Sequence, residues 1–234
     1  MRMSIATLVA IGAVMVLVAL GITDQVIPAA DPHTSDVRPW VAARALGVAA
    51  YLLLAGQVAL GLLLSHPRNT SEWRKSKQIF PWHELVTVFV TAFVALHVAL
   101  LAVDPYANVG WVGALVPGMS GFRTPAVAIG SISMYALLFT AITAKWTRLL
   151  PAGWWLKAHR FAALTFLLVW VHSVLAGTDG GALTALYLGT GLPILAGVAH
   201  RLWSARSRPR RTLPELPPVP SPVRPQPAAL VEES

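Results

Sequence analysis

The chain has 234 residues, of which 56% are hydrophobic and 12% are charged, and its mean hydropathy is +0.62. Apolar stretches of roughly 20 residues dominate it, so the composition indicates an integral membrane protein and excludes an ordinary soluble domain. Cysteine is absent, which excludes disulfides, cysteine-ligated iron–sulfur clusters and cofactors attached covalently through cysteine.

Six apolar segments are long enough to cross a membrane as α-helices, so the predicted fold class is all-α, a six-helix transmembrane bundle. The first segment follows Arg2 and could be a signal peptide, but its apolar run is long and no small-residue cleavage site follows it. We therefore expect it to be retained, which leaves both termini on one side. The predicted spans are residues 5–22, 41–64, 83–103, 125–144, 158–176 and 182–200.

The charges beside the spans predict the orientation. All but three of the 18 Lys and Arg residues fall on the side of the termini, whereas all five aspartates fall on the opposite side. Cytoplasmic loops carry an excess of Lys and Arg, so both termini are predicted to be cytoplasmic, in a multi-pass protein of the plasma membrane. The net charge of +8 is then explained by anchoring, without a nucleic-acid partner. The three outer arginines are Arg38, Arg44 and Arg123.

Two segments are predicted to lie outside the spans. Residues 104–124 carry prolines and glycines among apolar residues, which favours a position on the outer membrane interface. From residue 204 onward the composition changes to Pro, Arg, Ser and Glu, with eight of the chain's 18 prolines. Such a segment cannot bury enough apolar surface to fold. The predicted organisation is a transmembrane domain over 1–203 and a disordered cytoplasmic tail over 204–234.

Four histidines lie inside two of the apolar spans, His83 and His97 in one and His159 and His172 in another, 14 and 13 residues apart. An imidazole in hydrocarbon needs a partner, but two histidines of one span lie roughly 20 Å apart, too far to bind one metal ion. The two spans run parallel, so His83 has the depth of His159, and His97 that of His172. Two such pairs are what two stacked haem b groups need as axial ligands.

The angular positions fit this pairing less simply. At about 100° per residue, 14 steps end about 40° short of four turns, whereas 13 steps end about 140° short. The span with His83 and His97 therefore keeps one face toward its partner. The span with His159 and His172 needs a bend, a helical distortion or differently oriented ring planes.

Zinc binding and proton transfer account for these histidines less completely than haem does. A closed zinc site takes four ligands, and each pair offers two histidines without an evident carboxylate. A proton relay is a second function of intramembrane histidine, but few acidic residues accompany the four. His83 and His159 lie near an interface, where a histidine can simply extend to water. His97 and His172 lie deeper, where extension to water is harder.

Cations near each membrane face are expected where anionic haem propionates lie. Lys157 and Arg160 flank His159, and Arg44 lies just inside the outer end of the second span. All three also fit plain interfacial anchoring. Arg44 is the more informative of them, because it is an isolated arginine within apolar sequence. We take all three as candidate cofactor-binding residues.

With these two histidine spacings and an arginine opening the second span, residues from about 41 to 200 resemble the ferric reductase-like transmembrane domain family. This family includes the membrane cytochrome b part of ferric reductases and of NADPH oxidases, and the haem subunit of methionine sulfoxide reductase systems. The resemblance implies two non-covalent haem b groups with the axial pairs His83/His159 and His97/His172. It also implies a propionate-binding role for Arg44, and that the 13-residue spacing is a family trait.

The sequence shows no flavin or nicotinamide domain, unlike the oxidases and reductases of this family. We therefore expect an electron-transfer subunit that takes electrons from a separate cytoplasmic-side donor, a flavoprotein or quinol, and delivers them to an acceptor at the outer face. Ferric iron, oxygen, quinone or a partner oxidoreductase all remain open as acceptors. The alternatives are a proton-coupled transporter that uses the histidines as relays, and a membrane scaffold, which leaves the four histidines unexplained.

Overall fold

The computed structural model describes residue 10 and residues 37–65, 70–177 and 180–206. Within these ranges every regular element is a helix, which confirms the all-α class. Five of the described helical segments are long and apolar enough to cross a membrane, so the chain is a multi-pass membrane protein. The predicted span over 5–22 and nearly all of the predicted tail lie outside the described residues.

The five spans follow the predicted order, and the largest change at an end is the earlier start of α4. Two short helices, α5 (Gly110–Leu115) and the 3₁₀-helix η1 (Thr147–Leu149), lie between spans. The spans are α3 (Arg38–Leu64), α4 (Thr70–Val103), α6 (Thr124–Lys145), the consecutive helices α7 (Trp155–His159) and α8 (Phe161–Ala176), and α9 (Gly180–Arg206).

Helix ends follow the local sequence. A proline occupies the first turn of both α3 and α6, where its missing N–H group removes no helical hydrogen bond. Helix α4 begins at Thr70, well before the predicted span at 83, and contains Pro81. Hydropathy detects only the part of a helix that suits the membrane, so the polar first turns of α4 were not part of the predicted span.

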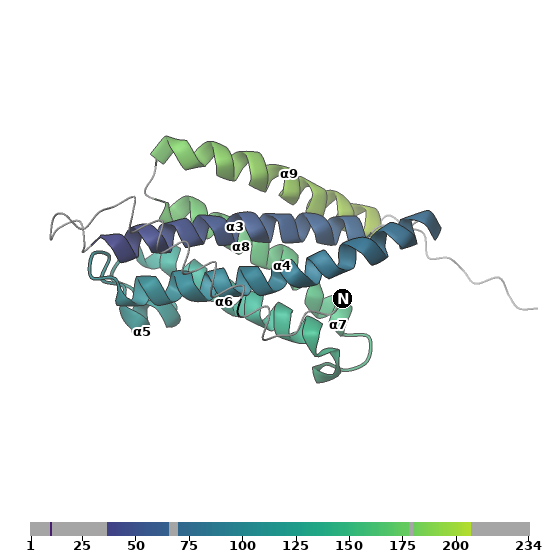
Figure 1. The fold of residues 1–234 in the computed structure, drawn as a ribbon, viewed down its shortest axis with the longest axis horizontal. Helices are drawn as coiled ribbons and strands as arrows, with labels where there is room; N and C mark the ends of the chain where they lie inside the picture. Colours follow the sequence, from purple (N-terminus) through teal and green to yellow (C-terminus); the bar gives the residue numbers. More distant parts are fainter. Residues whose placement is uncertain (1–9, 11–36, 66–69, 178–179, 207–234) are drawn as a thin grey trace, which may run out of the picture.

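The spans form two antiparallel hairpins. Helix α3 packs along α4, and α6 packs along α8, while α9 lies against α3 and α8 (Figure 1). Helix α5 and the N-terminal end of α3 lie at one end of the bundle, and α7 lies at the other. We call the end with α5 the outer end and the end with α7 the inner end, after the predicted topology.

At the outer end, Arg123 connects the hairpin of α6 and α8. Its Nη1 donates to the carbonyl oxygens of Leu175 and Gly177, at 3.0 and 2.9 Å. These carbonyls end α8 and have no helical N–H partner of their own, so a cation is well placed there. Arg123 lies just before α6 in the sequence, and its side chain supplies hydrogen-bond donors to the carbonyl groups at the end of α8.

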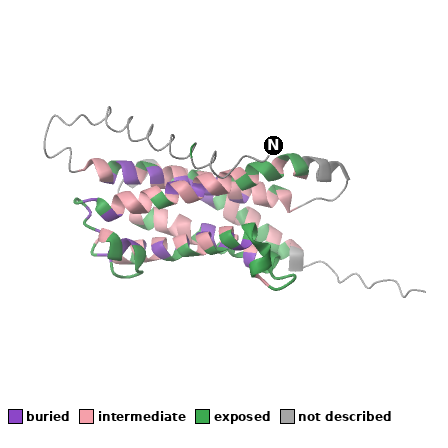
Figure 2. Ribbon diagram, turned by 60° about the horizontal axis from the view of Figure 1, so that its bottom comes forward, coloured by how far each residue is buried: buried purple, intermediate pink, exposed green. Residues whose placement is uncertain are grey.

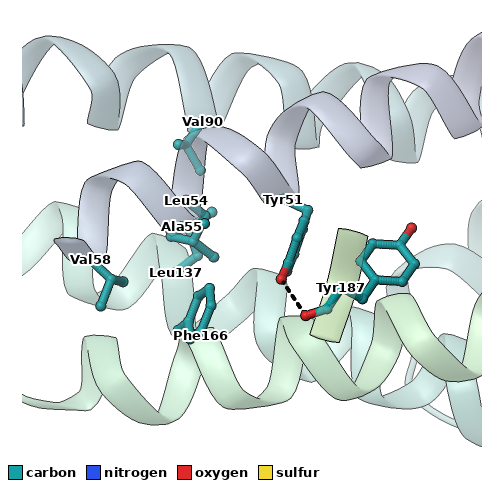
Figure 3. Packing of buried hydrophobic residues seen from close by; sticks show 8 residues of the cluster. All are labelled: Tyr51, Leu54, Ala55, Val58, Val90, Leu137, Phe166 and Tyr187. Atoms are coloured by element: carbon teal, nitrogen blue, oxygen red, sulfur yellow. Dashed lines mark hydrogen bonds between the residues drawn. The ribbon is translucent and has the colours of Figure 1, made fainter. Parts of the chain in front are cut away.

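Many large hydrophobic side chains are exposed on the bundle, and its most buried residues lie between the helices (Figure 2). One buried cluster occupies the middle of the bundle and includes Val90, which is 1% exposed, and Phe166, which is 0% exposed (Figure 3). Val90 lies midway between His83 and His97, and Phe166 midway between His159 and His172. The mid-bundle cluster consists of Tyr51, Leu54, Ala55, Val58, Val90, Leu137, Phe166 and Tyr187.

Polar contacts at the edge of this cluster hold α9 in place. The hydroxyl of Tyr51 on α3 lies 2.7 Å from Oγ1 of Thr190 and donates to the carbonyl oxygen of Tyr187 at 3.4 Å (Figure 3). Nε1 of Trp170 on α8 donates to the same carbonyl at 2.9 Å. In an apolar environment such groups need partners, so these bonds fix α9 against both α3 and α8.

Candidate functional site

The four intramembrane histidines lie in two pairs. The ring centroids of His83 and His159 are 6.1 Å apart, with an angle of 71° between the ring planes. Those of His97 and His172 are 6.4 Å apart, with an angle of 77°. These are the pairs expected from equal depth along parallel spans. We call them the inner pair and the outer pair.

A break in the helix separates His159 from His172. Helix α7 ends at His159, and α8 begins at Phe161. The N–H group of Arg160 donates to the carbonyls of Leu156 and Lys157, both at 3.2 Å, so the chain winds more tightly here than in an α-helix. The predicted span over 158–176 is confirmed as one membrane-crossing segment, Trp155–Ala176, with this irregularity at Arg160. The irregularity is a helical distortion of the kind that the 13-residue spacing was expected to need.

Backbone carbonyls orient the outer pair. Nδ1 of His97 lies 2.6 Å from the carbonyl oxygen of Ala43 on α3, and Nδ1 of His172 lies 2.7 Å from that of Ala126 on α6. A carbonyl can only accept, so each Nδ1 carries the hydrogen and donates. The lone pair of each imidazole is therefore on Nε2. This tautomer and this fixation by a carbonyl are those of metal-binding histidines in general.

Glycines make room for three of the four rings. A Cβ atom at Gly47 would lie 2.9 Å from Nδ1 of His97, and one at Gly130 would lie 2.6 Å from Cε1 of His172. At Gly61 a Cβ atom would lie 3.4 Å from Cε1 of His83, which is an ordinary contact. The outer pair thus depends on glycine more strongly than the inner pair does.

The separation within each pair suits two imidazoles on opposite sides of one metal ion. A metal–imidazole bond is about 2.0 Å long and the ring centroid lies about 1.2 Å behind the nitrogen, so the two centroids should be about 6.3 Å apart. The observed separations are 6.1 and 6.4 Å. Within the described ranges, no three His, Cys, Asp or Glu side chains gather to hold a metal ion. Two ligands suit haem, whose porphyrin supplies the remaining four.

Polar groups of α3 and α4 surround the inner pair. Nε2 of Gln57 donates to the carbonyl oxygen of His83 at 2.8 Å and to Oγ1 of Thr87 at 2.6 Å. Oε1 of Gln57 and the Nδ1 atoms of His83 and His159 are buried without a hydrogen-bond partner among the described residues. Such atoms are rare in proteins and indicate a polar group that binds nearby.

The three candidate cations lie in different environments. Cζ of Arg44 is 4.8 Å from the ring centroid of Trp40, and the side chain is half-buried. Nζ of Lys157 is 4.6 Å from the ring centroid of Trp154, and the side chain is exposed. Arg160 is also exposed. Arg44 is therefore the one of the three that packs within the bundle.

Sequence reasoning did not find Gln57 or the glycines beside the histidines. Gly47 and Gly61 are 14 residues apart, as are His83 and His97. Because α3 and α4 are antiparallel, equal spacing brings Gly61 to His83 and Gly47 to His97. This matched spacing is visible in the sequence, but it is informative only once α3 is known to pack against α4.

Comparison with known proteins identifies the family. A family model described as the ferric reductase like transmembrane component matches residues 46–170, more than half of the chain. The match includes three of the four histidines, begins just after Arg44 and ends just before His172. Members of this family typically bind haem. Comparisons with curated proteins and with solved structures found no match. The chain belongs to the ferric reductase-like transmembrane component family.

Proposed function

We propose that this chain is a transmembrane cytochrome b, the electron-transfer subunit of a ferric reductase-like oxidoreductase. It binds two non-covalent haem b groups, one through His83 and His159 and one through His97 and His172. The observation that carries the proposal is the separation of the rings in each pair, which is within about 0.2 Å of that for two axial imidazoles on one iron.

The neighbours of the outer pair support this role. The carbonyls of Ala43 and Ala126 each accept a hydrogen bond from Nδ1 and so leave Nε2 free to bind iron. These hydrogen bonds also fix the ring planes, which reduces the cost of ordering the ligands when the cofactor binds. Bound haem supplies a centre that gains and loses one electron at a time.

The mid-bundle cluster supports a function that spans the membrane. The two pairs are separated by roughly 20 Å along the helices. Buried apolar side chains, Phe166 among them, lie at the depth between the two pairs (Figure 3). Close-packed apolar side chains leave little room for water, so the bundle can place two redox sites at different depths without forming a path for ions.

Charges near the two pairs suit anionic haem propionates. Arg44 precedes Gly47, which contacts His97, by about one helical turn and is half-buried, so we assign it to the cofactor of the outer pair. Lys157 and Arg160 flank His159 at the inner end, and we assign them the same role at the inner pair. Their exposure also suits the docking of an electron donor.

The charge distribution supports a direction of transfer. With the inner end in the cytoplasm of a plasma-membrane protein, electrons enter from a cytoplasmic-side donor, either a partner flavoprotein or quinol. They leave at the outer end to an acceptor there. The inner end carries the exposed basic side chains of Lys145, Arg148, Lys157 and Arg160, which suit an acidic partner surface.

Electron transfer across a sealed membrane tests the proposal. Purified protein is reconstituted into vesicles that contain ferricyanide, and an impermeant reductant is added outside. We expect ferricyanide to be reduced inside vesicles that carry the wild-type chain. Empty vesicles and vesicles with the His97→Ala variant are the controls and should show little reduction. Equal rates in all three preparations would overturn the proposal.

A further inference from the structure

Helix α9 covers one of two edges of the candidate site. The histidine pairs lie between two hairpins, one of α3 and α4 and one of α6 and α8. Helix α3 meets α8 along one edge of this space, and α4 meets α6 along the other. Helix α9 packs on α3 and α8 and so covers the first edge (Figure 1). At the inner end the second edge is bridged by an ion pair between Glu84 of α4 and Lys145 of α6.

Arg201 approaches the inner pair from the edge that α9 covers. In the sequence this residue opens the basic segment after the last span, where plain anchoring explains it. In the structure its Nη2 donates to the carbonyl oxygen of Ser65 at 2.7 Å. Ser65 caps the end of α3 and lies one helical turn after Gly61, the residue that contacts His83. Arg201 is therefore close to the depth of the inner pair.

One nitrogen of the Arg201 guanidinium lacks a partner among the described residues. Its Nη1 atom is buried and forms no hydrogen bond there. An unpaired donor on a buried charged group costs several kcal/mol, on the order of the values for other buried polar groups. An anionic acceptor beside Nη1 would remove this cost.

The outer pair also has an arginine nearby. Arg44 follows Ala43, whose carbonyl oxygen accepts the hydrogen bond from His97. Each histidine pair therefore has one arginine near it in the fold, Arg44 on α3 and Arg201 on α9.

We propose that Arg201 binds a propionate carboxylate of the haem held by His83 and His159. This proposal rests on the proposed function. A guanidinium is always charged and its planar N–H groups match a carboxylate. Arg201 then fixes which way the inner haem faces, with its acidic side toward α9, and neutralises charge that would otherwise lie in the membrane.

A phosphate of a lipid headgroup is the other anion that could reach this guanidinium. Two properties separate the two sources. A propionate loses its negative charge when the cofactor is replaced by its dimethyl ester, which binds iron in the same way. Every phospholipid carries a phosphate, so a lipid phosphate is absent only when the protein is held in a detergent without phosphate.

The test uses the full chain in a detergent without phosphate, such as dodecyl maltoside, titrated electrochemically while the haem absorption is followed. Arg201→Gln removes a unit charge, which acting over about 10 Å at an effective dielectric constant of about 20 changes a one-electron equilibrium roughly tenfold. We expect one haem transition to fall by about 59 mV, the value for a tenfold change. It should be the transition that His83→Ala abolishes. The matched control is Arg148→Gln, which removes an exposed charge at the same end.

Titration of the cofactor-free protein with haem or with its dimethyl ester identifies the anion. We expect Arg201→Gln to weaken the binding of haem but not that of the ester, because only haem carries free carboxylates. Equal weakening for both cofactors, or a difference in potential that appears only when phospholipid is added, would overturn the proposal. Equal potentials in Arg201→Gln and Arg148→Gln would also overturn it. If Arg201→Gln does not accumulate, Arg201→Met takes its place, because it also removes the charge, and wild-type potentials in that variant would count against the proposal. A chain that binds no haem would instead refute the proposed function.

Discussion

Gly47 on α3 lies against the imidazole of His97 on α4, so closely that a Cβ atom would come within 2.9 Å of Nδ1. Real Cβ contacts are longer, so Gly47→Ala must push the ring away from its position. The same movement weakens the hydrogen bond from Nδ1 to Ala43. We expect this variant to lose most of the haem of the outer pair while keeping that of the inner pair. The measurement is the haem-to-protein ratio of the purified variant.

The helix offers matched controls for this substitution. At Gly61 a Cβ atom would make an ordinary contact of 3.4 Å with His83, and at Gly56 it would meet nothing within 4 Å. Gly61→Ala and Gly56→Ala should therefore both keep the wild-type ratio. If all three alanine variants behave alike, contact with the histidine is not what makes Gly47 necessary.

Removing one histidine of a pair should remove one cofactor. His97→Ala and His172→Ala leave a single axial ligand in the outer pair, and the inner pair is roughly 20 Å away. Each variant should bind about one haem per chain, and His83→Ala and His159→Ala should lose the other one. Potentiometric titration distinguishes the two, since a different transition disappears in each case. Loss of both transitions from every variant would argue against separate sites.

Both pairs hold their imidazole planes nearly at right angles, at 71° and 77°. Crossed axial planes leave two iron d orbitals almost equal in energy, so the oxidised protein should give strongly anisotropic low-spin EPR signals. Low-temperature EPR of the purified protein tests this. A rhombic spectrum with three resolved features would show near-parallel rings and would contradict the observed geometry.

The predicted orientation can be tested at two exposed positions in a chain without native cysteine. Gly121 lies in the outer loop, where a Cβ atom meets nothing within 4 Å, and Thr147 lies in η1 at the inner end. On intact cells an impermeant thiol reagent should label Gly121→Cys but not Thr147→Cys, because the basic inner end faces the cytoplasm. The reverse pattern of labelling would show that the orientation is wrong.

The positions of the described spans follow from hydropathy because lipid selects for it directly. Helix α3 was predicted over 41–64 and observed over Arg38–Leu64, and α6 was predicted over 125–144 and observed over Thr124–Lys145. The break at Arg160 was not predicted as such. The 13-residue spacing required some distortion there, but only backbone hydrogen bonds show where the helix changes its winding.

The surroundings of the histidines could not be predicted, because they depend on which helices are neighbours. Gly130 became informative only when α6 was found against His172, and Gln57 only when α3 was found against His83. Arg201 is one of several basic residues after the last span. Its sequence context is that of an anchor, and only the contact with Ser65 places it beside the bundle.

The number of haems bound by the purified chain tests the central claim most directly. Cofactor is extracted with acidified acetone and divided by the protein concentration from amino-acid analysis. Each of the two histidine pairs supplies both axial ligands for one haem, so we expect about two non-covalent haem b groups per chain, with six-coordinate low-spin spectra. A ratio near zero in protein that is folded and membrane-inserted would contradict the account.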